Sequence, residues 1–296
     1  MKQVILLLSM VSMVFAAEGN LRYTITVEKF KNEAGWHGRW NIGDGFTTMM
    51  TNALNKSGHF IVLGDAEMRG AAMAEQDLAA TGRMAGGKKT PQMGRMTPAQ
   101  LLVRGSITHV ENTTATSSGR VRFKGISLGK SGGKGEVNIT MYLVDSETGQ
   151  VKASTEVVGK AKRSGVSLGY YGSALSGLTG DLAGFEKDNV GKACADAVDQ
   201  GVKFLVDQLE DVQWEATVIM AGSKTVLNRG TREGVAAGDR FIAGEVEELV
   251  DPDTGEVLDY SMNIVGELEV TQVKEKVAYC KVVSGTVEKG MSVFPK

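Results

Sequence analysis

One strongly patterned hairpin limits what this chain can fold into more than any other stretch. Apolar side chains recur at every second position of residues 136–144, at Val137, Ile139, Met141 and Leu143. Successive side chains of a strand point to opposite faces, so these four share one face. Residues 151–158 alternate in the same way, and between the two runs Asp145 starts a turn that Gly149 completes with a positive φ. Residues 135–162 are therefore predicted to form a β-hairpin with one buried face.

Two stretches of low hydrophobicity flank this hairpin, residues 112–134 and residues 162–184, and both are rich in glycine. The whole chain has 38 glycines and only 4 prolines. This balance favours a β-rich protein with tight turns over a disordered one, which usually contains more proline and more charge. The two stretches are interpreted as insertions around the hairpin.

The N-terminus is typical of a secretory signal peptide. Lys2 precedes an apolar run in residues 4–15, and Ala16 and Ala17 supply the small residues of a cleavage site. The run is too short for a membrane-spanning helix, which needs about 20 apolar residues. We therefore expect residues 1–17 to be removed on export, with a retained anchor as the rival interpretation. The sequence near the cut has no cysteine that could carry a lipid.

The length of 296 residues fits two domains, predicted at residues 18–211 and 212–296. Helices in the first domain are expected at residues 44–56, capped by Asp44, from Asp65 to about residue 82, and at residues 188–209, with one helical turn at residues 98–102. Strands are expected at residues 21–28, 60–63 and 102–111, before the hairpin. This order predicts an α+β fold in which helices cover one face of a mixed sheet.

The second domain is predicted to be a small all-β barrel, closed or partly open. Short apolar runs separated by glycines indicate strands at residues 217–220, 240–243, 246–250, 265–273 and 277–283. Residues 251–257 repeat the turn pattern of residues 145–151, so the same turn is expected twice. Cys194 and Cys280 fall in different domains, and Cys194 is interpreted as a packed free thiol.

Five motifs follow one another between residues 44 and 209. They are residues 45–54 (GFTTMMTNAL) with 60–63 (FIVL), Arg69 with residues 73–76 (MAEQ), residues 102–108 (LVRGSIT), residues 138–149 (NITMYLVDSETG), and Ala197 with residues 202–205 (VKFL). In this order they resemble the CsgG/HfaB family, the outer-membrane secretion channel of the curli system and its relatives. Residues 228–241 (NRGTREGVAAGDRF) resemble the SH3-like C-terminal barrel of the flagellar FlgT type.

The resemblance implies a periplasmic α/β domain that assembles into a homo-oligomeric ring. In the channel members each subunit gives two hairpins to one shared transmembrane barrel, and the two glycine-rich stretches fall at the corresponding places. The loop after the first strand narrows the channel in the family. The residues of this chain at that loop are Trp36, His37, Arg39, Trp40 and Asn41.

The glycine-rich stretches have two interpretations. Residues 120–125 and 164–172 alternate as membrane strands do, so these side chains would face lipid: Val121, Phe123, Val166, Leu168 and Tyr170. In the other interpretation both stretches are flexible periplasmic loops. Trp36 and Trp40 also have two interpretations. The rings would either line a pore or pack on the sheet edge.

Other functions find little support in the sequence. The net charge of −2 gives no indication of a nucleic-acid partner. Residues 125–131 have three residues between their glycines, whereas a phosphate-binding loop needs four. His37, His59 and His109 lack the spacing of metal ligands. No nucleophile and base can be paired, so neither an enzyme nor a cofactor is expected.

The leading hypothesis is a non-enzymatic, ring-forming protein of the periplasm or outer membrane of a Gram-negative-type bacterium. It would act as a curli-type secretion channel or an assembly/transport component, with a secreted polypeptide as cargo and accessory envelope proteins as partners. The alternative is a soluble periplasmic scaffold or regulator ring of a flagellar or cell-wall machine. A third hypothesis, a periplasmic domain that binds glycan or peptide, rests only on the loop at Trp36 and Trp40.

Overall fold

A mixed sheet forms the centre of the unit that spans Arg22–Leu209 in the computed structural model. Residues 21–38, 40–113, 122–123, 126–127, 134–161, 188–255 and 257–296 are described by this structure. The strands of the sheet run in the order β3-β1-β4-β7-β8, and β2 pairs with β4 further along. They are β1 (Tyr23–Val27), β2 (Lys31–Asn32), β3 (Phe60–Val62), β4 (Leu101–Thr113), β7 (Lys134–Asp145) and β8 (Val151–Lys160). A separate two-residue pair joins β5 (Arg122–Phe123) to β6 (Ile126–Ser127).

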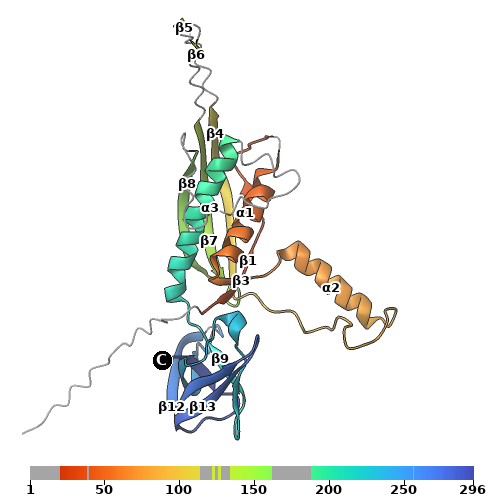
Figure 1. The fold of residues 1–296 in the computed structure, drawn as a ribbon, viewed down its shortest axis with the longest axis vertical. Helices are drawn as coiled ribbons and strands as arrows, with labels where there is room; N and C mark the ends of the chain where they lie inside the picture. The colour runs from red at the N-terminus through yellow and green to blue at the C-terminus, as the bar shows by residue number, and fades with distance from the viewer. Residues whose placement is uncertain are drawn as a thin grey trace, which may run out of the picture. The chain divides into compact units, whose positions relative to one another are not determined.

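Strand direction divides the sheet into two parts. β1, β2 and β3 run parallel to their neighbours, whereas β7 is antiparallel to both of its neighbours, β4 and β8. Two helices, α1 (Ile42–Ser57) and α3 (Asn189–Asp207), pack on the same face of the sheet and against each other (Figure 1). This confirms the predicted α+β fold with helices on one face. The remaining helix, α2 (Ala66–Ala80), has no buried residue and lies away from the sheet (Figure 1).

The hairpin of β7 and β8 has the predicted buried face. Val137, Ile139 and Met141 are fully buried and Leu143 is 1% exposed, because alternation turns them toward the helices. In the turn, the Asp145 side chain accepts hydrogen bonds from the backbone N–H groups of the second and third residues after it. Gly149 has a φ of 73°. The turn that starts at Asp251 repeats this geometry, as expected, with Gly255 at a φ of 76°.

Two local predictions in this unit are wrong. Asn41, and not Asp44, caps α1, because the Asn41 side chain accepts a hydrogen bond from the Asp44 N–H over 3.2 Å. No helical turn forms at residues 98–102, because the Gln100 N–H bonds to Thr24 and β4 begins at Leu101. The tertiary contact of Gln100 with β1 therefore overrides the local helical tendency.

The unit that contains Glu210–Lys296 is a closed barrel with the strand order β10-β13-β12-β11-β14-β9. Its strands are β9 (Ala216–Met220), β10 (Thr225–Leu227), β11 (Arg240–Val250), β12 (Val257–Val273), β13 (Ala278–Gly285) and β14 (Ser292–Pro295). Two 3-10 helices are η2 (Gln208–Asp211) and η3 (Thr231–Glu233). The rings of Trp214 and Phe241 stack in the core with centroids 5.4 Å apart.

The sequence missed part of this barrel. β10 and β14 were not predicted, since each has only three or four residues. Residues 240–243 and 246–250 are predicted as two strands, but they form the single strand β11, whose pairing with β12 shifts register between Ala243 and Gly244. The barrel itself is confirmed, and it is closed.

Candidate functional site

The predicted constriction loop connects β2 to α1. β2 pairs with β4 at Ser106 and Ile107, and the N–H groups of Glu33 and Ala34 both bond to the Ile107 carbonyl. After Ala34 the chain leaves the sheet and returns at Asn41. The sheet therefore fixes the point at which the loop begins, and the cap of α1 fixes the point at which it ends.

One asparagine holds the loop in shape. The Asn32 side-chain Nδ2 donates to the Trp36 carbonyl over 2.8 Å, and the Trp36 N–H donates to Asn32 Oδ1 over 3.3 Å. A side chain that satisfies both backbone groups of one residue stabilises a tight loop. The sequence alone does not identify Asn32 as a loop residue, because its role depends on the position of the Trp36 backbone.

The two tryptophans of the loop contact each other. The centroids of the Trp36 and Trp40 rings lie 4.8 Å apart at 56°, a tilted arrangement that aromatic pairs favour. Gly38 lies against the Trp36 ring, because a Cβ at this position would fall within 2.5 Å of three ring atoms. Both rings are half-buried, and they border a shallow hollow of about 420 Å³ together with Asn32, His37, Gly38 and Asn41.

The base of the loop is fixed by a buried threonine. The Thr47 hydroxyl accepts from the Phe30 N–H over 3.0 Å and donates to the Gly43 carbonyl over 2.7 Å. The Phe30 and Phe46 rings pack beside it with centroids 4.7 Å apart. The base of the loop is thus held by buried hydrogen bonds and by an aromatic contact.

Of the five residues predicted for this loop, the structure brings four together. Trp36, His37, Trp40 and Asn41 line the same hollow, and His37 is exposed. Arg39 lies outside the described residues. Their role at a channel constriction stays a prediction.

The membrane-facing candidates fall mostly outside the described residues. Val121, Val166, Leu168 and Tyr170 are not described. Phe123 belongs to β5 and pairs through its backbone with Ile126. Their contact with lipid stays a prediction as well. In the described part of the chain, no helix is long and apolar enough to cross a membrane.

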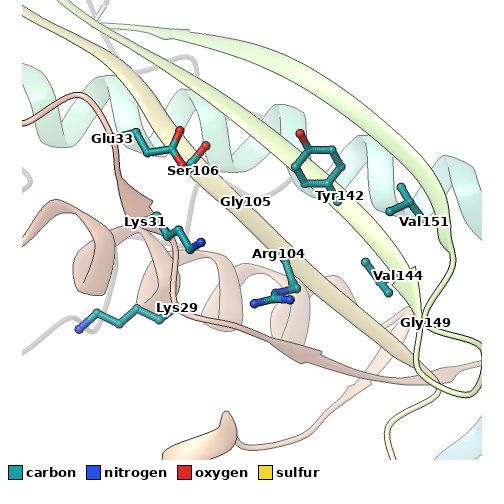
Figure 2. A pocket seen from close by; sticks show the side chains of 10 residues that line it. All are labelled: Lys29, Lys31, Glu33, Arg104, Gly105, Ser106, Tyr142, Val144, Gly149 and Val151. Atoms are coloured by element: carbon teal, nitrogen blue, oxygen red, sulfur yellow. The ribbon is translucent and has the colours of Figure 1, made fainter.

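The sheet carries a second hollow, of about 450 Å³, on its other face (Figure 2). Arg104 and Tyr142 alternate with the buried Val103 and Leu143, so they point away from α1 and α3. The lining residues are Lys29, Lys31, Glu33, Arg104, Gly105, Ser106, Tyr142, Val144, Gly149 and Val151. No local sequence pattern indicates this hollow, because it forms only when segments from β2, β4 and the hairpin come together.

Charge in this hollow is mainly positive. The Lys29 Nζ lies 2.5 Å from the Asp44 carboxylate, whereas Lys31 and Arg104 have no ion pair among the described residues. Tyr142 and Ser106 add hydroxyl groups. The arrangement can attract an anionic group.

Both thiols of the chain are buried, and one carboxyl group of α3 is half-buried. Cys194 and Cys280 are both free and buried, and burial raises the pKa of both thiols, that of Cys280 to about 12. Burial and the neighbouring Asp196 raise the pKa of Asp199 in α3 from 3.8 to about 6. Among the described residues, no three His, Cys, Asp or Glu side chains are grouped as metal ligands.

Comparison with known families decides the classification. A family model described as the curli production assembly/transport component CsgG matches residues 7–235, well over half of the chain. The chain belongs to the CsgG family. This membership confirms the resemblance found in the sequence, and it places the chain among cell-envelope proteins of the transport or assembly type.

Solved structures give more distant similarities. The PelC dodecamer from Paraburkholderia phytofirmans is 14% identical and has a TM-score of 0.30, over 60% of this chain and 86% of that one. The hypothetical protein CT253 from Chlamydia trachomatis is 12% identical and has a TM-score of 0.35, over 64% of this chain and 96% of that one. Lipoprotein GNA1162 from Neisseria meningitidis is 15% identical and has a TM-score of 0.28, over 52% of this chain and 93% of that one. No curated protein sequence matches the chain.

Proposed function

We propose that this CsgG-family chain forms a homo-oligomeric ring in the envelope of a Gram-negative-type bacterium. The ring serves as a curli-type secretion channel or as an assembly component of one. After loss of residues 1–17, residues 18–211 form the ring domain and residues 212–296 form an accessory domain. A secreted polypeptide is the cargo, accessory envelope proteins are the partners, and no catalytic step is needed.

The observation that carries this proposal is the common origin of the two glycine-rich stretches. β4 and β7 stay paired up to Thr113 and Lys134, where the first stretch lies between them. β8 ends at Lys160, which pairs with Glu136, and the second stretch follows it. α3 then begins at Asn189, whose backbone lies against Gly135. Both stretches therefore leave the sheet from the same end.

Two hairpins that leave side by side suit a wall shared by many copies. A strand in lipid must have its backbone groups bonded on both sides, so one copy alone is not viable there and ring closure is required. Phe123 and Ile126 pair in antiparallel register. By sequence count, about ten residues separate this pair from each of β4 and β7, which is the length of a membrane strand. In this arrangement the lipid-facing side chains are Val121, Phe123, Val166, Leu168 and Tyr170.

We place the loop of residues 36–41 at the narrowest point of the channel. Two half-buried rings on a loop with a rigid base provide a contact surface that keeps its shape. Aromatic rings contact any extended polypeptide with little dependence on its sequence. Such a loop would limit the size of the cargo without binding it tightly.

Electron microscopy of the native complex tests the proposal. The complex is purified in parallel from the soluble periplasm and from detergent-extracted outer membrane. Rings that carry a detergent belt are expected in the membrane fraction. Rings without a belt, or monomers, found only in the soluble fraction would contradict the channel.

A deletion variant tests the role of the glycine-rich stretches. Removal of residues 121–134 and 166–184 should leave a folded, soluble protein, because the sheet and its helices remain. Circular dichroism measures the outcome. Loss of the folded spectrum would mean that these stretches belong to the core.

The alternative function is a soluble periplasmic scaffold or regulator ring of a flagellar or cell-wall machine. The closed barrel formed by β9 to β14 favours it, since a pore does not require an additional folded unit. Belt-free rings in the soluble fraction are the result that this function predicts.

A further inference from the structure

Two strands of the barrel run on beyond it as a ribbon. β14 pairs with β11 only from Phe241 to Gly244, and β13 pairs with β12 only from Gly266 onward. Past these points β11 and β12 pair with each other alone, as far as the turn that starts at Asp251. We call residues 245–255 and 257–264 the ribbon.

The outer edge of the ribbon is open along β11. Among the described residues, no strand pairs with residues 245–250 except β12 on their inner side. Six residues are the length of an ordinary strand. An edge of this kind presents a row of unpaired N–H and C=O groups, which is a template for a further strand.

The two faces of the ribbon differ in chemistry. The register places Val246 beside Met262 and Gly244 beside Ile264 on one face, and Ile264 is 53% exposed. The other face carries Glu245 beside Asn263 and Glu247 beside Ser261. Glu248 beside Tyr260 then falls on the face of Val246, and Leu249 beside Asp259 falls on the face of Glu247. An added strand would therefore meet carboxylate and apolar side chains in alternation at residues 245–247, and a mixture of the two beyond them.

Charge on this part of the chain is entirely negative. Residues 241–273 contain no lysine, arginine or histidine, and their acidic residues are Glu245, Glu247, Glu248, Asp251, Asp253, Glu256, Asp259, Glu267 and Glu269. At the open edge, Glu245, Glu247 and Glu248 have no ion pair among the described residues. A second copy of the ribbon would bring like charges face to face, which is destabilising. The complement of this edge is a basic strand.

We propose that the outer edge of β11 at residues 245–250 accepts an extended segment of a partner protein in which basic and apolar residues alternate. Main-chain hydrogen bonds extend the barrel sheet in line with β14. Basic side chains of the partner lie beside Glu245 and Glu247, and its apolar side chains cover Val246. This interaction goes beyond the channel and does not depend on it, because it uses the barrel alone.

A peptide of alternating lysine and valine, ten residues long and labelled for fluorescence anisotropy, is the probe. It is titrated with the full chain at low and at high salt. Binding should weaken as salt rises, since exposed charges contribute to it. A peptide that differs from it only by proline at two central positions cannot pair along an edge, and should bind at least about tenfold more weakly.

Charge reversal locates the site. Glu245→Lys with Glu247→Lys should weaken binding by at least about tenfold, because like charges then oppose the peptide. The matched control is Glu75→Lys with Asp77→Lys on the exposed face of α2, which makes the same change of charge and should leave binding unaltered. Circular dichroism verifies that both variants fold.

Hydrogen exchange supplies a readout that needs no variant. Saturating peptide should slow amide exchange in residues 245–250 and leave α2 unchanged. Equal binding of the proline peptide would reduce the contact to charge attraction and overturn the proposal. The proposal would also be overturned if the alternating peptide did not bind, or if the ribbon variant and the α2 variant bound it with the same affinity.

Discussion

α3 and α2 begin alike and contribute differently. An aspartate caps each of them, Asp188 for α3 and Asp65 for α2, and in both the capping side chain accepts a backbone N–H. α3 then buries ten of its residues, whereas α2 buries none. Isolated helices of about 15 residues are marginal in water, and packing of an apolar face provides most of their stability in proteins. The cap therefore sets where a helix begins, and burial sets how much it stabilises the fold.

The largest difference between the helices should come from matched leucines. Leu205 of α3 is fully buried, whereas Leu78 of α2 is 42% exposed. Leu205→Ala should lower the free energy of unfolding by about 2–5 kcal/mol, because it leaves a cavity. Leu78→Ala should change it by less than about 0.5 kcal/mol. Urea unfolding measures both, and equal effects would show that α2 is packed in solution.

Protonation offers a test of intermediate size. The pKa of Asp199 is raised from 3.8 to about 6 by burial and by Asp196, so the folded state binds its proton more tightly than the unfolded chain. Its contribution to stability is therefore present below pH 3.8 and is lost as the pH rises toward 6. Asp199→Asn should raise stability at pH 7 by about 1–2 kcal/mol, with allowance for partial exposure.

The measurement for Asp199 is urea unfolding of parent and variant at several pH values between 3.5 and 7.5, a window that spans roughly the folded and unfolded pKa values. Asp77→Asn on α2 is the control, because Asp77 is exposed. The gap between parent and Asp199→Asn should widen with pH, whereas the control should follow the parent. A constant gap would mean that the carboxyl group of Asp199 is hydrated in solution.

Removal of the two caps should have a smaller effect and a different kind of effect on each helix. Asp188→Ala should lower global stability by about 1 kcal/mol, because α3 unfolds with the sheet. Asp65→Ala should reduce helical content without a shift of the main transition. Circular dichroism at 222 nm, a wavelength that reports roughly on helix content, follows both. If both Asp188→Ala and Asp65→Ala lowered global stability, α2 would unfold together with the rest of the core.

The smallest expected effect comes from one glycine in each helix. At Gly70 of α2 a Cβ would meet nothing within 4 Å, so Gly70→Ala should favour the helix by up to about 1 kcal/mol. At Gly201 of α3 a Cβ would lie 2.5 Å from the Met141 Cε, so Gly201→Ala should gain less or destabilise. Gly70→Ala should therefore raise the helical signal in circular dichroism without moving the main thermal transition, whereas Gly201→Ala should leave the midpoint of that transition unchanged or lower it. A Gly70→Ala variant that raises the midpoint would contradict the difference between the helices.

The sequence predicted what local chemistry decides. The turn at Asp145, the cap at Asp65 and the alternation of β7 were all readable, because each depends on neighbouring residues. The exposure of α2 was not readable, since Met68 and Met73 form the same pattern in a packed helix as in an unpacked one.

Contacts between distant segments account for the other misses. Asn41 caps α1 at the end of a loop whose shape depends on Asn32. The sequence pattern alone therefore could not decide whether Asn41 or Asp44 is the capping residue. The hollow beside Arg104 requires three segments of the sheet to meet. For the loop itself, the residue types at Trp36 and Trp40 were sufficient to select it, but not to show that the two rings contact each other.

The burial of both native thiols gives the chain a practical property. A thiol whose pKa is raised and whose sulfur is covered reacts slowly with maleimide reagents at neutral pH. The two native cysteines should therefore take up little label, so they need not be replaced before site-specific labelling. A single cysteine placed at the exposed His37 would carry a spin label or a fluorophore into the loop. Distances between such labels would test the proposed ring, since they would report how many copies surround one axis and how wide the opening between them is.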